Sequence, residues 1–326
     1  MPRDLRAEAV SRPDSGAVRV TYLGTSTLLF DDGASRLMID GFITRPGWWT
    51  VLGRELRTDE SLVDRTLAQV GAERLDAVFV VHSHYDHALD AAYVARSTGA
   101  TLYGSHSTLN VGRGGGLAES ELRAVIPGSE YTVGRFHVTA IGSRHLQNRN
   151  PVIRPVLEWA LGGEIEDPLV QPAHSTAYNE GGVLDLMIRH GDLRVLVKAT
   201  ADFVPGALRG RSADIVFLGI GGLGKASPEH RDALYDEVVC TLAPRWIIPI
   251  HWDDFARPLF EPLRAMPRLM DDTAASLDYL IGQADADRSL TLHLLDTFQS
   301  ATLPEARAEE SPASAWCAGR EALRDP

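Results

Sequence analysis

The stretch His82-Ser-His-Tyr-Asp-His87 directly follows an apolar run at residues 76–81. A short, near-continuous apolar run is typical of a strand buried on both faces. Side chains repeat every two residues in an extended segment, so His82 and His84 point the same way, whereas Asp86 and His87 lie where the chain turns into a helix. One short loop therefore offers two imidazoles to one metal ion, and a carboxylate and an imidazole to a second. Such ligands without thiolate favour zinc, iron or manganese.

Two further histidines follow predicted strands. His145 comes shortly after a β-type run at residues 136–141, and His251 comes directly after another at 246–250. Polar residues at strand ends are where rigid scaffolds present ligands and catalytic groups. We therefore predict that His145 and His251 also belong to the metal site.

Strand-like runs alternate with helical patterns along most of the chain. Apolar residues at helical spacing predict helices at 60–70, 88–97 and 228–242. Apolar runs bounded by turn residues predict strands at 18–23, 27–30, 36–40, 76–81, 101–103, 136–141, 183–188, 193–197, 214–218, 246–250 and 290–294. The predicted fold class is α/β, with sheets covered by helices.

The pattern His-x-His-x-Asp-His after an apolar strand, with lone histidines after later strands, resembles the metallo-β-lactamase superfamily. The opening residues 20–30 and 37–40 also resemble its first hairpins, and the resemblance covers about residues 18–255. It implies a four-layer αββα sandwich with the metal site at the edge between two sheets. It also implies the metal ligands, which are His82, His84 and His145 for the first ion, and Asp86, His87 and His251 for the second.

One segment departs from the family pattern. The superfamily usually has Gly-Asp-Ser/Thr after the strand that corresponds to 193–197, and that Asp bridges both metals. Here the segment reads Val197-Lys-Ala-Thr-Ala-Asp-Phe203, and a direct register places Thr200 at the bridging position. Asp202 faces the same way if the chain stays extended, so it is a tentative ligand. Without it the second metal would be held more weakly, in a mononuclear or asymmetric site.

These residues predict a metal-dependent hydrolase. Imidazole ligands leave a position open on the metal and lower the pKa of its bound water to about 7, which supplies a metal-bound hydroxide. Asp86 would orient the hydroxide and pass its proton to the leaving group of an ester, lactone, amide or phosphodiester. The alternatives are a single-iron dioxygenase on the same scaffold and a non-catalytic metal-binding module.

The domain organisation is predicted as a lead-in at 1–16, one metallo-β-lactamase-like domain at 17–301 and a tail without a core face at 302–326. A proline-containing insertion at 146–180 predicts a lid. Trp48 and Trp49 cannot both face one core, so they either line a pocket mouth as substrate-binding residues or cover a sheet edge. The motif and the insertion resemble lactonase and phospholipase-D-like branches of the superfamily.

Composition excludes several classes of function. The chain has 326 residues with 32 basic and 44 acidic side chains, and a net charge of −12 disfavours nucleic acids as partners and leaves a small-molecule substrate. No apolar run is long enough for a membrane span, and residues 1–16 do not form a secretory signal. Cys240 and Cys317 form neither a disulfide framework nor a thiolate zinc site. These features predict a cytoplasmic protein with reduced thiols.

Overall fold

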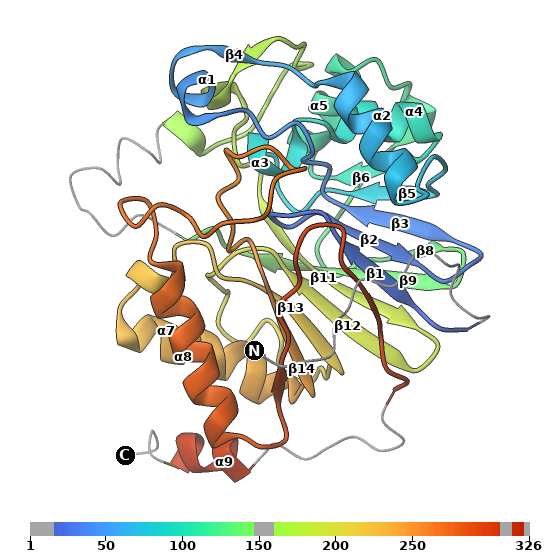
Figure 1. Ribbon diagram of the computed structural model, residues 1–326. Coiled ribbons are helices and arrows are strands. Elements are labelled where there is room, and N and C mark those ends of the chain that lie inside the picture. The colour runs from blue at the N-terminus through green and yellow to red at the C-terminus, as the bar shows by residue number, and fades with distance from the viewer. Residues whose placement is uncertain (1–15, 147–159, 307–314, 323–326) are drawn as a thin grey trace.

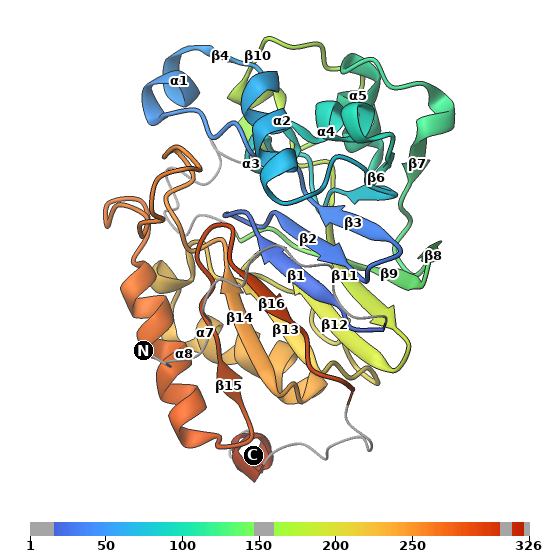
Figure 2. The same ribbon diagram turned by 45° about the vertical axis from the view of Figure 1, so that its right-hand side comes forward.

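Two large sheets stack face to face in the computed structural model, which describes residues 16–146, 160–306 and 315–322. Helices α2, α4 and α5 cover the outer face of one sheet, and α7 and α8 cover the outer face of the other (Figures 1 and 2). The predicted four-layer αββα sandwich is therefore confirmed. The predicted lead-in at 1–16 lies outside the described residues except for Gly16.

Within the described residues, the first sheet has seven strands and is built mainly from the N-terminal half of the chain. Strands β1, β2 and β3 form two successive antiparallel hairpins, whereas β3, β5, β6 and β7 run parallel to one another. In spatial order the strands are β16 (Ser300–Thr302), β1 (Arg19–Tyr22), β2 (Leu28–Asp31), β3 (Arg36–Ile39), β5 (Ala77–Phe79), β6 (Thr101–Gly104) and β7 (Leu122–Ala124).

The described part of the second sheet also has seven strands, and its parallel half carries the C-terminal part of the domain. In spatial order the strands are β15 (Thr291–Leu292), β14 (Trp246–Ile250), β13 (Ile215–Gly219), β12 (Leu193–Lys198), β11 (Val183–His190), β9 (Phe136–Ser143) and β8 (Glu130–Val133). A separate two-stranded sheet pairs β4 (Glu55–Leu56) with β10 (Ala173–His174).

Most of the helices are short. The α-helices are α1 (Trp48–Gly53), α2 (Glu60–Gln69), α3 (Tyr85–Ala88), α4 (Ala91–Thr98), α5 (His106–Gly114), α7 (Pro228–Tyr235), α8 (Thr273–Ala286) and α9 (Ala315–Ala322). The 3-10 turns are η1 (Glu119–Glu121), η2 (Ser175–Ala177) and η3 (Leu223–Lys225), and η4 (Asp236–Cys240) is a π-helical turn. None of the described helices is long and apolar enough to cross a membrane.

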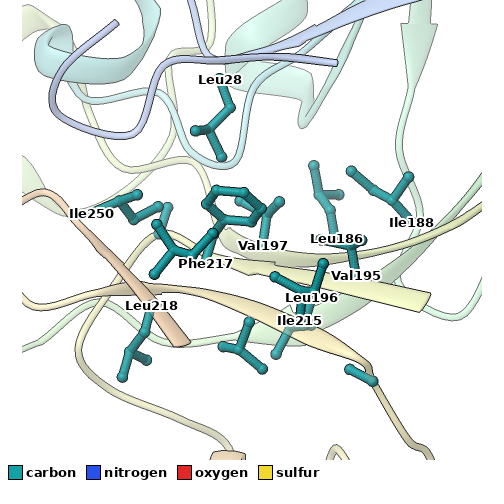
Figure 3. Packing of buried hydrophobic residues seen from close by; sticks show 14 of the residues in the cluster. Leu28, Leu186, Ile188, Val195, Leu196, Val197, Ile215, Phe217, Leu218 and Ile250 are labelled. Carbon is teal, nitrogen blue, oxygen red and sulfur yellow. The ribbon is translucent and has the colours of Figure 1, made fainter. Parts of the chain in front are cut away.

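The main core lies between the two sheets. Figure 3 shows Leu28 of β2 pointing toward Phe217 and Val197 of the second sheet, while Leu218 points to the opposite face. Phe30 meets Phe217 edge to face, with ring centroids 5.9 Å apart. This arrangement requires β12 and β13 to be apolar on both faces, which explains their near-continuous apolar runs.

The C-terminal segment differs from the prediction. A disulfide joins Cys240 of η4 to Cys317 of α9, so the prediction of reduced thiols is wrong. Arg320 of α9 also pairs with Asp236 at 2.6 Å, and Cys317 is buried, so the described part of 302–326 is not a tail without a core face. Two cysteines in the composition do not indicate a disulfide framework, but a single disulfide is enough to anchor the short helix α9. The disulfide thus removes one of the features from which the cytoplasmic location was predicted.

Candidate metal centre

Three separate segments bring the predicted ligands to one edge of the sandwich. The motif begins three residues after β5, and its second half forms the short helix α3. His145 follows β9, and His251 directly follows β14, so the second sheet supplies these two side chains. The structure thus brings together the six side chains that were predicted to bind metal, as two groups of three.

The first group consists of His82, His84 and His145, whose candidate ligand atoms all lie within 4.8 Å of one another. Burial, followed by repulsion from neighbouring imidazoles, lowers the pKa of His82 well below its ordinary value. Burial also lowers the pKa of His145 to about 3. The imidazoles are therefore neutral near pH 7, which is the form that ligates a metal.

Hydrogen bonds select one nitrogen on two of these rings. Nε2 of His84 lies 3.3 Å from the carbonyl oxygen of Leu161, and Nδ1 of His145 lies 3.1 Å from that of Leu146. Because a carbonyl oxygen can only accept, these two nitrogens donate, and the opposite nitrogens keep their lone pairs. Neither nitrogen of buried His82 has a hydrogen-bond partner among the described residues.

The second group consists of Asp86, His87 and His251, again with candidate ligand atoms within 4.8 Å of one another. Asp86 Oδ2 lies 3.2 Å from Nε2 of His251 and 3.8 Å from Nε2 of His87. Burial would raise the pKa of Asp86, but these two imidazoles hold it well below its ordinary value, so the carboxylate is ionised. The ring centroids of His82 and His87 are only 3.8 Å apart, so the two groups adjoin.

Sequence reasoning missed Asp40 and Ser26 as part of this site. Nδ1 of His87 lies 2.7 Å from Oδ2 of Asp40, and the Ser26 hydroxyl contacts both of these atoms. Asp40 Oδ1 also accepts from the backbone N–H of Val81, just before the motif. The available signal was the position of Asp40 directly after β3, which meets the same strand-end criterion that selected His145.

A buried ion pair supports the loop that carries His251. Arg45 and Asp253 pair with both side chains fully buried, and Asp253 Oδ1 accepts from the Thr25 N–H at 2.8 Å and from the Tyr22 hydroxyl at 2.9 Å. The backbone N–H of His251 in turn donates to the carbonyl of Thr25. His251 has a φ of 56°, an unusual conformation that these contacts stabilise.

The tentative ligand Asp202 is not in either group within the described part of the chain. Its carboxylate instead accepts from the backbone N–H of Phe203 at 2.8 Å. The Thr200 hydroxyl donates to the carbonyl of Arg144 at 2.7 Å. Asp202 and Thr200 therefore add no further ligand to the six candidate residues.

The two predicted substrate-binding tryptophans have different surroundings. Trp48 donates to Asp254 at 3.2 Å, and its ring centroid lies 5.3 Å from that of Phe255, which lies 5.5 Å from the ring of His251. Trp49 is 88% exposed. In the predicted lid at 146–180, residues 147–159 lie outside the described part, and Leu161 reaches His84 through its carbonyl.

The four-layer sandwich, with two adjoining candidate metal-binding groups at its edge, defines the class of this protein as an α/β protein with a candidate metal centre. The chain belongs to the metallo-beta-lactamase superfamily, because the model of that family matches residues 20–282. The resemblance stated from the sequence is therefore confirmed.

This chain is similar in sequence to known metal-dependent hydrolases and in fold to solved structures. A UPF0173 metal-dependent hydrolase from Heliobacterium modesticaldum is 25% identical over 282 residues, which cover 85% of this chain and 98% of the relative. Igni18, a metallo hydrolase from Ignicoccus hospitalis, superposes with a TM-score of 0.52 at 15% identity, over 89% of this chain and 99% of its own. CmlA, a diiron beta-hydroxylase from Streptomyces venezuelae, superposes with a TM-score of 0.51 at 15% identity, over 90% of this chain and 55% of its own.

Proposed function

We propose that this protein is a metal-dependent hydrolase that cleaves an ester, lactone, amide or phosphodiester bond of a small molecule. The observation that carries the proposal is the convergence of six candidate metal ligands into two groups, each with its candidate ligand atoms within 4.8 Å of one another. The relative from Heliobacterium modesticaldum carries the name of a metal-dependent hydrolase, which supports the same activity.

The residues fit one or two divalent ions. Both buried nitrogens of His82 have no hydrogen-bond partner among the described residues, and such a group needs a ligand to offset its desolvation. The donor set is five imidazoles and one carboxylate, which suits zinc and also accepts iron or manganese. Asp40 behind His87 is the outer carboxylate that commonly orients a metal-bound imidazole.

When bound, the metal supplies Lewis acidity and lowers the pKa of water. Asp86 is the group of this chain that handles the proton. Its Oδ2 faces His251, whereas its Oδ1 makes no hydrogen bond to the described residues. Oδ1 is therefore able to orient the attacking water, accept its proton and deliver that proton to the leaving group.

An aromatic wall beside the second group supports binding of an apolar part of the substrate. Phe255 lies at its centre, with ring centroids of Trp48 at 5.3 Å, His251 at 5.5 Å and Tyr85 at 6.4 Å. Apolar contacts of this kind orient a small molecule, while polar groups act on its reacting bond. We assign substrate contact to Trp48 and Phe255, and not to the exposed Trp49.

The test combines elemental analysis with a panel of lactone, ester, amide and phosphodiester substrates. We expect one or two equivalents of metal, and hydrolysis that chelation abolishes and added metal restores. His84→Ala should lose both metal and activity, whereas the matched control His137→Ala, away from the site, should keep both. Full hydrolysis by metal-free protein would contradict the proposal. Bound iron with oxygen consumption in place of hydrolysis would favour the dioxygenase alternative.

A further inference from the structure

The histidine motif is held by the backbone of a segment that lies about eighty to a hundred residues further along the chain. Ser83, between His82 and His84, donates its backbone N–H to the carbonyl of Glu180 at 2.9 Å. The N–H of Glu180 donates in turn to the carbonyl of Leu161 at 2.9 Å. The same Leu161 carbonyl lies 3.3 Å from Nε2 of His84 and accepts from it. One carbonyl is therefore shared between this backbone segment and a candidate metal ligand.

The Leu161 carbonyl belongs to two paired stretches, residues 161–163 and 179–181, which we call the backbone clamp. Besides the bond to Leu161, the N–H of Gly181 donates to the last carbonyl of the first stretch at 2.9 Å. The side-chain amide of Asn179 donates to the middle carbonyl of that stretch at 2.7 Å. Three hydrogen bonds thus fix the first stretch on the second. The Leu161 carbonyl can turn away from His84 only if the clamp opens.

Gly181 allows the clamp to approach the motif. It has a φ of 65°, and a Cβ at this position would overlap the side chain of Ser107 in α5 and lie 2.8 Å from Oγ of Ser83. Both serines are fully buried, so neither side chain has room to move aside. The next residue, Gly182, also has a positive φ, of 85°, but it is exposed, and a Cβ there would meet no described atom within 4 Å. Close packing against the motif therefore requires glycine at position 181 alone of these two.

We propose that the backbone clamp is part of the metal centre, and that Gly181 is a positioning residue through which the Leu161 carbonyl reaches His84. The inference rests on the proposed function only in that His84 binds metal. An outer acceptor fixes the orientation of a metal-binding imidazole, and its loss usually weakens metal binding by about 10–100-fold. Since coupling between two equilibria is reciprocal, metal bound at His84 should stabilise the closed clamp by the same factor.

The first experiment compares the two adjacent glycines in the full-length, chelator-stripped protein. Both Gly181→Ala and Gly182→Ala place alanine at a positive φ, so the difference between them isolates the overlap with the two serines. Zn²⁺ affinity is measured by competition with a chelating dye. Gly181→Ala should weaken binding by about tenfold or more and change the absorption spectrum of bound Co²⁺. Gly182→Ala should keep the wild-type spectrum and an affinity within about twofold of the wild type.

The second experiment needs no variant. Amide hydrogen exchange of the wild type is measured with and without saturating Zn²⁺ at the N–H groups of Glu180 and Gly181, which are both donated inside the clamp. Exchange at both should become about tenfold slower or more when Zn²⁺ is bound, because exchange requires the clamp to open. The N–H of Leu290, donated to Asp287 in a turn away from the clamp, is the reference and should change much less.

The outcomes separate this inference from the function on which it rests. Equal Zn²⁺ affinities of folded Gly181→Ala and Gly182→Ala would overturn the inference and leave the hydrolase proposal standing. If Gly181→Ala does not fold, the wild-type exchange decides, and a Zn²⁺ effect at Glu180 and Gly181 no larger than that at Leu290 would overturn the inference. A wild type that binds no metal at all would overturn the inference together with the proposed function.

Discussion

Nδ1 of His87 lies 2.7 Å from Oδ2 of Asp40, and both side chains are buried. Because a carboxylate can only accept, His87 donates through Nδ1, which leaves Nε2, 3.8 Å from Asp86 Oδ2, as the ring nitrogen that can ligate a metal. The geometry is that of an outer carboxylate that fixes the tautomer and the orientation of a metal-binding imidazole. Asp40 thereby connects strand β3 to the motif that follows β5.

Replacing Asp40 by Asn should weaken metal binding by about 10–100-fold, the usual effect of losing such an outer carboxylate. Asparagine still offers an oxygen to the Val81 N–H but removes the charge behind His87. Affinity is measured by competition with a chelating dye, and folding is checked by circular dichroism. Asp64→Asn, on an exposed position of α2, is the control and should leave affinity unchanged. Equal affinities in the two variants would refute the role assigned to Asp40.

The core of the site was accessible from the sequence because its ligands are close together in the chain. His82, His84, Asp86 and His87 occupy one short loop, and His145 and His251 each follow a strand. Asp40 was not assigned a role because it acts through His87, 47 residues away. Only the parallel pairing of β3 with β5, in which Ile39 lies opposite Phe79, brings the two segments together.

Other features depended on where strands end and on long-range contacts. Asp202 would face the metal site only if the chain stayed extended beyond residue 197, but β12 ends at Lys198 and the two-residue alternation of side chains ends with it. Helix α8 was not predicted. The disulfide joins cysteines that are 77 residues apart, a pairing that spacing alone cannot reveal.

The two adjacent tryptophans provide a matched pair for testing the aromatic wall. Trp48→Ala removes a ring that packs on Phe255, whereas Trp49→Ala removes a side chain that is 88% exposed. On any hydrolysed member of the substrate panel we expect Trp48→Ala to lower kcat/KM about tenfold, equivalent to ~1.4 kcal/mol of lost contact. Trp49→Ala should stay within twofold of the wild type, on the order of surface-substitution effects. Equal losses in both variants would remove Trp48 from the binding surface.

The buried pair of Arg45 and Asp253 should matter for stability far more than surface pairs do. Arg45→Met leaves the Asp253 carboxylate buried without its cation, which should cost about 3–5 kcal/mol of unfolding free energy. The double variant Arg45→Met/Asp253→Asn should recover part of this loss, since the remaining amide is neutral.

Urea unfolding measures both variants. The control is Arg96→Met, which breaks an exposed pair with Glu60 and should cost less than about 1 kcal/mol. A loss in Arg45→Met no larger than that of the control would show that the ion pair does not hold the His251 loop.

Asp32 should make stability depend on pH in the acid range. Its side chain is buried and accepts from Arg135 Nε at 2.8 Å and from the N–H groups of Ser35 and Ala34 at 2.7 and 2.9 Å. Burial alone would raise its pKa, but these donors, led by Arg135, lower the pKa of Asp32 to about 2. The unfolded value is about 3.9, so the folded state binds this proton less readily. The resulting stabilisation is present above about pH 4 and is lost as the pH falls toward 2.

Asp32→Asn should therefore lower the unfolding free energy by about 2 kcal/mol at pH 7. Urea unfolding is measured for the variant and the wild type from pH 7 down to 2.5. The contributions of the other acidic groups largely cancel in the difference between the two unfolding free energies. This difference should hold from pH 7 to about 5 and then shrink as wild-type Asp32 becomes protonated. The exposed control Asp192→Asn should show a small difference across the whole range. If the difference in unfolding free energy between Asp32→Asn and the wild type stayed constant down to pH 2.5, the negative charge of Asp32 would not be the source of the stabilisation.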